Sequence, residues 1–151
     1  MTKISTPVAS VVQMRVIIIA PPPGVLFALQ RGSSELLLPS VAHAELLQFD
    51  FTLRVGSPLS NGAPNFLGEY AQGPATDRFI YLNSGTLAGQ EASPWTHRAK
   101  LKLASIPREL AEAAIASPDQ VIEARIRGTL PNGSPVHASL KPDAVEWSLA
   151  P

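Results

Sequence analysis

The stretch "LQFDFTLRV", residues 47–55, decides the fold class of this chain. Every second residue is apolar, from Leu47 to Val55, and the residues between them are Gln, Asp, Thr and Arg. Successive side chains of a β-strand point to opposite faces, so this alternation predicts a strand with one face in the core and the other in water. A strand of this kind is typical of an antiparallel sheet.

The same alternation appears further along the chain in "RAKLKLA", residues 98–104, where Arg98, Lys100 and Lys102 fall on one face. Twelve Lys and Arg balance twelve Asp and Glu, so the formal net charge is +0. We therefore interpret these cations as a solvated strand face and disfavour a functional basic patch. Further runs with the length and composition of strands lie at residues 14–20, 25–31, 78–87, 119–130, 134–140 and 144–150.

One segment, "SIPRELAEAAIAS" at residues 105–117, has the pattern of a helix. We expect Ser105 to be its N-cap, Pro107 to lie in its first turn, and Pro118 to end it. Further on, Asn132 and Gly133 suit the left-handed backbone of a tight turn, which predicts a hairpin there.

These patterns predict an all-β, or β-rich α+β, fold: an antiparallel barrel or sandwich of about eight strands, closed by one helix near residues 106–116. The chain has 151 residues, the size of one ordinary domain. We expect a flexible leader over residues 1–13 and a single globular β-rich domain over residues 14–151. The sequence alone leaves barrel and sandwich open.

Composition excludes several functional classes. The chain has no Cys, which removes disulfides and thiolate metal sites. It has no block of basic residues, so we expect neither a nucleic-acid partner nor a membrane-surface partner. The apolar run at residues 16–20 is too short for a signal peptide or a bilayer span, so we expect a cytoplasmic protein. Zero net charge and 45% hydrophobic residues permit a homo-oligomer.

Motifs for metals and nucleotides are absent from the sequence. There is no phosphate-binding loop, no dinucleotide fingerprint and no nucleophile elbow. The histidines His43, His97 and His137 lie far apart, without the close spacing typical of metal ligands. We therefore expect no metal and no cofactor.

A long connection over residues 56–76 separates two predicted strands and is rich in Gly and Pro. Connections of this length in a compact domain are usually functional or mobile. Phe66 and Tyr70 within it indicate that part of it packs against the domain. We therefore expect a site beneath this connection.

Four segments resemble a bacterial family of small proteins known only as a domain of unknown function: "GVLFALQRG" (24–32), "FDFTLRV" (49–55), "NFLGEYAQGPATDRFIYLNSGT" (65–86) and "HRAKLKL" (97–103). The third segment contains the pattern G-x-Y-x-x-G-P-x-x-x-R-F-x-Y-L. The resemblance covers roughly residues 14–103. It implies a fold and a region of interest, but no reaction.

The positions that match the family's pattern are Gln30, Arg31, Gly68, Tyr70, Gly73, Arg78, Phe79, Tyr81, Leu82, Arg98 and Lys100. Members of the family have Trp-Gly after the Tyr-Leu pair, where this chain has Asn83, Ser84 and Gly85. The predicted helix and hairpin after residue 103 lie beyond the part of the chain that resembles the family. The resemblance therefore implies that they are an addition to the family's domain.

The preferred hypothesis is a binding or interaction module, with a site under the 56–76 connection built from Tyr70, Arg78, Tyr81 and Arg98. Arg guanidinium groups and Tyr rings suit a small anionic or aromatic ligand. For Arg78 an ion pair with its neighbour Asp77 is the structural alternative.

The alternative is a small-molecule enzyme, an isomerase or hydrolase that works by general acid/base chemistry. His97 is its candidate base by residue type, with Asp77 or Glu69 as the second proton-transfer group. An enzyme requires these groups to converge around a cavity, whereas a binding surface does not.

Overall fold

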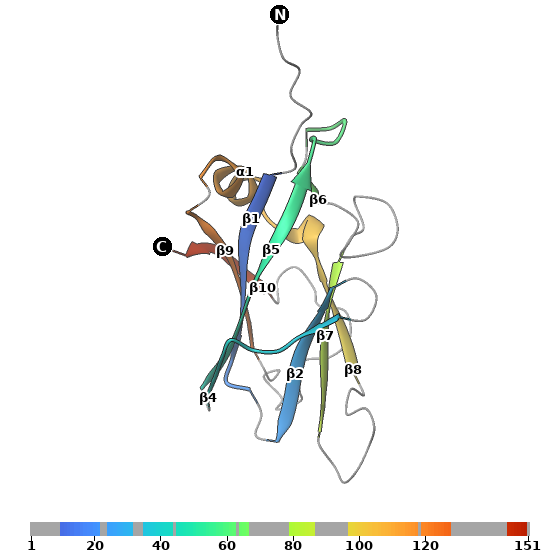
Figure 1. Cartoon of the computed structure of the whole chain (residues 1–151), viewed down its shortest axis with the longest axis vertical. Coiled ribbons are helices and arrows are strands. Elements are labelled where there is room, and N and C mark those ends of the chain that lie inside the picture. Colours follow the sequence, from blue (N-terminus) through green and yellow to red (C-terminus); the bar gives the residue numbers. More distant parts are fainter. Residues whose placement is uncertain are drawn as a thin grey trace, which may run out of the picture.

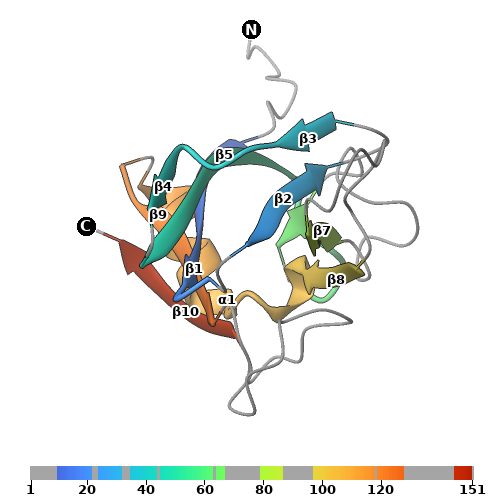
Figure 2. The same cartoon turned by 90° about the horizontal axis from the view of Figure 1, so that it is seen from below.

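The computed structural model describes residues 10–21, 24–31, 35–43, 45–62, 64–66, 79–86, 97–117, 119–127 and 145–150. Strands dominate these ranges and form two sheets (Figures 1 and 2). The predicted β-rich, sandwich-like fold is confirmed, and within the described ranges the strands do not close into one barrel.

The larger sheet has six strands in the order β10-β9-β1-β5-β4, with β6 also paired to β5. β1 and β9 run parallel, unlike the all-antiparallel arrangement predicted from the sequence, and the other pairs are antiparallel. The strands of the larger sheet are β1 (Ser10–Ile19), β4 (Val41–His43), β5 (Leu46–Gly56), β6 (Asn65–Phe66), β9 (Val121–Arg127) and β10 (Val145–Ala150).

The smaller sheet has four antiparallel strands in the order β3-β2-β7-β8. Residues 38–40 connect its edge strand β3 to β4 of the larger sheet, so the segment 35–43 spans the two sheets (Figure 2). The strands of the smaller sheet are β2 (Val25–Arg31), β3 (Glu35–Leu37), β7 (Phe79–Thr86) and β8 (His97–Lys102).

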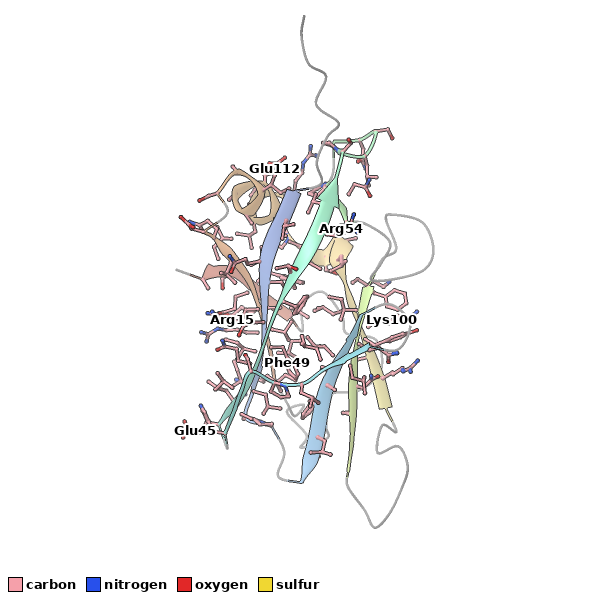
Figure 3. The ribbon with its side chains drawn as sticks, viewed as in Figure 1. Arg15, Glu45, Phe49, Arg54, Lys100 and Glu112 are labelled. Atoms are coloured by element: carbon pink, nitrogen blue, oxygen red, sulfur yellow. The ribbon has the colours of Figure 1, made fainter. Side chains whose placement is uncertain are left out.

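The core lies between the two sheets, because alternate residues of each strand face inward as the sequence pattern predicted. Across the larger sheet, Val16 pairs with Phe49 on one side and with Ala124 on the other, and all three are 0% exposed. Ile80 and Leu82 supply the facing layer from β7. Figure 3 shows Phe49 between the sheets, with Arg15 and Lys100 toward the two outer sides.

Helix α1 (Arg108–Ala116) contacts β1, β9 and β10 at one end of the larger sheet and buries Ala111 and Ala114 (Figure 1). The predicted N-cap at Ser105 is wrong. Ser105 ends a 3₁₀ turn, Leu103–Ser105, and Pro107 is the N-cap of α1. A residue before proline is disfavoured in the α-region, and Ile106 is accordingly extended, so the helix cannot include it.

Strand boundaries differ from the sequence predictions at several places. β1 begins at Ser10, inside the predicted leader, because Val12 packs in the core with 1% exposure. The connection at 56–76 contains a short strand, β6, which pairs with the end of β5 to make a hairpin. The predicted strand at 134–140 and the turn at Asn132 lie outside the described residues.

Candidate functional site

The outer face of the four-stranded sheet carries the most distinctive group of side chains. It is formed by the residues that alternate with the core positions of β2, β7 and β8. Register places Arg98 opposite Asn83, and Lys100 opposite Tyr81. We call this surface the basic-aromatic face, and its members are Gln30, Phe79, Tyr81, Asn83, Arg98, Lys100 and Lys102.

The guanidinium of Arg98 is held from three directions. Its Nε donates to Asn83 Oδ1 at 3.2 Å, and its Nη2 donates to Gln30 Oε1 at 3.3 Å. Its central carbon lies 4.5 Å from the ring centroid of Tyr81, which is cation–π distance. Three residues from two strands, Gln30 of β2 and Tyr81 and Asn83 of β7, therefore fix the orientation of one cation.

The two amides that hold Arg98 also bind each other. Asn83 Nδ2 donates to Gln30 Oε1 at 3.0 Å, and the two residues are 1% and 9% exposed. Buried polar groups need partners because water cannot reach them. This pair is neutral, so it orients Arg98 without cancelling its charge. Among the residues that the structure describes, no carboxylate forms an ion pair with Arg98.

A second cation–aromatic pair lies beside the first. Lys100 Nζ is 4.6 Å from the ring centroid of Phe79. The rings of Phe79 and Tyr81 meet edge to face, with centroids 4.9 Å apart and an interplanar angle of 69°. The described part of this face thus combines cations with half-buried aromatic rings and carries no acidic side chain.

The outer face of the six-stranded sheet is also polar, but its central charges are paired. Arg15 Nε donates to Asp50 at 3.0 Å, and Arg125 Nε donates to Glu123 at 2.7 Å. Glu123 also lies 3.9 Å from a second Arg15 nitrogen. This alternation of paired charges runs across three strands, β5, β1 and β9, and leaves little net charge there for a ligand.

Asp50 is the acidic centre of that paired network. Partial burial acts to raise the pKa of Asp50, but hydrogen bonds from Ser40, Gln48 and Arg15, together with the charge of Arg15, outweigh it and lower the pKa below its usual value. The Ser40 hydroxyl is 2.6 Å from the carboxylate. This environment favours a permanently ionised carboxylate, unsuited to proton transfer near neutral pH.

The described part of the 56–76 connection covers a groove against helix α1. Arg108 spans its rim, donating from Nη2 to the Gly62 carbonyl at 3.0 Å and from Nε to Glu112 at 3.2 Å. The groove has a volume of about 330 Å³. It is lined by Val55, Gly56, Pro58, Gly62, Pro64, Glu112, Ile115 and Ala116.

The structure brings two of the predicted ligand-binding residues together: Tyr81 and Arg98 are in direct contact. Neither of them lines the groove beneath the connection. Tyr70, Arg78, Asp77 and Glu69 lie outside the described residues, and so does the His97 side chain, although the His97 backbone belongs to β8.

Asn83 is a residue of the candidate site that the sequence did not point to. It was noted only as part of the segment that replaces Trp-Gly in the family pattern, but it accepts the hydrogen bond from Arg98. Gln30 was present in the resemblance without a role. Asn83 and Gln30 lie 53 positions apart in the sequence, and only the strand register shows that they form a hydrogen bond.

The described ranges contain no group of three or more His, Cys, Asp or Glu residues that could hold a metal ion. None of the helices in these ranges has the length and apolar character needed to span a membrane. Together, these features define a β-rich, sandwich-like protein, and the described part of its basic-aromatic face has cations without acidic partners.

The family model described as a family of unknown function (DUF5990) matches residues 12–150, and the chain belongs to this family. The match continues past the resemblance seen in the sequence, through α1, β9 and β10. The segment after residue 103, which looked like an addition, is therefore part of the family's domain. No curated protein and no solved structure matches the chain.

Proposed function

We propose that this protein is a binding module and that its basic-aromatic face takes up a small ligand with an anionic group. One observation carries this proposal: Arg98 is oriented by two neutral amides and an aromatic ring, with no carboxylate paired to it in the described part of the chain. A structural arginine is more commonly neutralised by an acidic partner, as Arg15 and Arg125 are.

The hydrogen-bonding chemistry of the guanidinium supports an anion as the ligand. Asn83 and Gln30 occupy Nε and Nη2, and Nη1 has further N–H groups to donate. A guanidinium binds carboxylate and phosphate oxygens through short, charge-assisted hydrogen bonds. Lys100 and Lys102 on the same face increase the attraction for negative charge.

Preorganisation also favours binding. Immobilising a flexible side chain when a complex forms costs about 0.5–1.5 kcal/mol. The contacts from Asn83, Gln30 and Tyr81 restrain Arg98 before any ligand arrives, so less of this cost falls on binding. Half-buried Tyr81 and Phe79 offer apolar surface to a planar group attached to the anion. An aromatic carboxylate has both features.

The general acid/base alternative has less support. Its candidate groups, His97, Asp77 and Glu69, have side chains outside the described residues. The described carboxylate with a clear pKa shift, Asp50, is shifted downward, away from the range of a general base. We therefore favour binding over catalysis.

Titration of the protein with benzoate and with inorganic phosphate, followed by two-dimensional NMR of the backbone amides, tests this proposal. We expect benzoate to shift the amides of β7 and β8, and we expect Arg98→Gln to weaken binding about tenfold, which corresponds to about 1.4 kcal/mol. The matched control is Arg127→Gln, which removes the same charge from an exposed position on the other sheet. Equal benzoate affinity in the Arg98→Gln variant and the unmodified protein would rule the proposal out.

A further inference from the structure

Lys100 is a second cation without an acidic partner on the basic-aromatic face. Its ammonium lies 4.6 Å from the ring centroid of Phe79, and among the residues that the structure describes none forms an ion pair or a hydrogen bond with it. An ammonium has three N–H groups to donate. A ring face attracts a cation but does not neutralise it. The described part of this face therefore holds two uncompensated charges next to aromatic rings, those of Arg98 and Lys100.

These two charges lie over β7, one after the other along that strand. In the strand register Arg98 is directly opposite Asn83, and Lys100 is directly opposite Tyr81. Each cation nevertheless lies against a ring two residues earlier in β7: Arg98 contacts Tyr81, and Lys100 contacts Phe79. Both side chains therefore lean over β7 in the same direction.

The spacing of the two charges suits one compact anion. Alternate residues of a strand have Cα atoms about 7 Å apart, and two side chains that lean the same way keep roughly this spacing at their ends. The two rings beneath them are closer, with centroids 4.9 Å apart. Charge-assisted hydrogen bonds to a phosphate are about 2.7–2.9 Å long, so two oxygens of one phosphate reach donors roughly 7–8 Å apart. One phosphate can therefore contact both cations.

The charged groups and the rings are both accessible from solvent. Arg98 is exposed, and Lys100, Tyr81 and Phe79 are half-buried. The partly exposed rings offer apolar surface to a planar group esterified to the phosphate. The face therefore combines a place for a compact anion with a place for an aromatic group.

We propose that the ligand of the basic-aromatic face is a phosphate monoester of a small planar group, with its phosphate bound between Arg98 and Lys100. This inference rests on the proposed function of the same face and names the class of its ligand. A phosphate monoester carries close to two negative charges at neutral pH, one for each cation, whereas a carboxylate carries one. Arg98 donates from a planar guanidinium, and Lys100 supplies a point charge with rotatable donors.

Phenyl phosphate and phenyl sulfate are a matched pair of probes, because they have the same ring and the same tetrahedral shape. Near pH 8, about two units above the second pKa of a phosphate monoester, the phosphate is a dianion and the sulfate is a monoanion. Two-dimensional NMR titration of the backbone amides measures both affinities. We expect phenyl phosphate to bind about fivefold more tightly, because only the dianion compensates both cations. Equal affinities would overturn the proposal.

Substitutions in the protein identify the second cation. Lys100→Gln should reduce the preference for phosphate over sulfate to less than about twofold, whereas Lys100→Arg should retain it. Lys102→Gln removes the same charge from the next outward position of β8 and should keep the preference at about threefold or more. If Lys100→Gln and Lys102→Gln lower the preference equally, total charge determines it and the proposal is wrong.

The same titrations separate this inference from the proposed function. Melting temperatures and one-dimensional NMR spectra check that each variant is folded. Equal binding of phenyl phosphate and phenyl sulfate that depends on Arg98 would overturn the ligand class and leave the proposed function standing. If neither probe binds and benzoate does not bind, both are wrong.

Discussion

Arg108 of helix α1 donates a hydrogen bond from Nη2 to the backbone carbonyl of Gly62, and this bond joins the helix to the turn of the β5–β6 hairpin. The bond depends on a glycine. Gly62 has a φ of +83°, and a Cβ at this position would lie 2.5 Å from Arg108 Nη2. A side chain at position 62 would therefore require the Arg108 guanidinium to move and would break this hydrogen bond.

Gly62→Ala should lower the free energy of unfolding by about 1–2 kcal/mol from the left-handed backbone alone, and should also displace Arg108. Gly24→Ala is a matched control, because Gly24 has a φ of +77° and nothing within 4 Å of its added Cβ. We expect the Gly62 variant to be the less stable of the two by about 0.5–1 kcal/mol in urea unfolding, the value of one hydrogen bond. Equal losses would mean that the Arg108 contact contributes nothing to stability.

Asn83→Ala should destabilise the protein by about 1–3 kcal/mol, because it removes one of the donors to the buried Gln30 oxygen and the acceptor of Arg98 Nε. A double-mutant cycle with Arg98→Ala measures the coupling. We expect a coupling energy of at least about 0.5 kcal/mol, as is usual within one hydrogen-bond network. Additive losses would show that Arg98 and Asn83 act independently.

Asp50 should make the protein less stable in acid. Its pKa is lower in the folded protein than the ordinary value of 3.8, so the unfolded chain binds the proton first as pH falls. Its stabilising contribution is present in full well above pH 3.8 and is lost as pH falls through 3.8 toward the lower folded value. Melting curves recorded across this range should show a shallower decline for Asp50→Asn than for the unmodified protein. Parallel declines would contradict the lowered pKa.

Glu123→Gln should cost about 1 kcal/mol of stability. The carboxylate is 8% exposed, but its partners Arg15 and Arg125 are 30% and 48% exposed and remain hydrated when the ion pair is lost. The loss should therefore stay below the roughly 3–5 kcal/mol typical of a fully buried pair. Glu146→Gln, at an exposed position of the adjacent strand β10, should change stability by less than about 0.5 kcal/mol. Guanidinium would screen these charges, so urea is the denaturant for this comparison.

The strand pattern could be predicted from the sequence because it is local. The alternation at 47–55 correctly placed Phe49 inward and Asp50 outward, since a period of two allows no other arrangement with one buried face. The helix start could not be placed from the cap residue alone: Ser105 suits an N-cap, but the preference of Ile106 for an extended conformation before Pro107 determines the outcome.

The arrangement of the strands and the hydrogen bonds of the site could not be predicted, because both depend on register between distant segments. Arg98 and Gln30 are 68 positions apart, and β7 lies between their strands. The alternation of Arg98, Lys100 and Lys102 was visible in the sequence. The neutral partners of Arg98, on which the proposed binding function rests, appear only when β2, β7 and β8 are aligned.

The parallel pairing of β1 with β9 has a consequence for synthesis of the chain. Gln13 pairs with Val121, so the second edge of β1 receives its partner only after most of the protein has left the ribosome. Until then β1 can pair with β5, but its other edge, rich in Val and Ile, stays open to foreign strands. Pairings this distant in sequence also slow folding. We therefore expect nascent chains that stall before β9 to aggregate, and chaperones to act on this protein late in its translation.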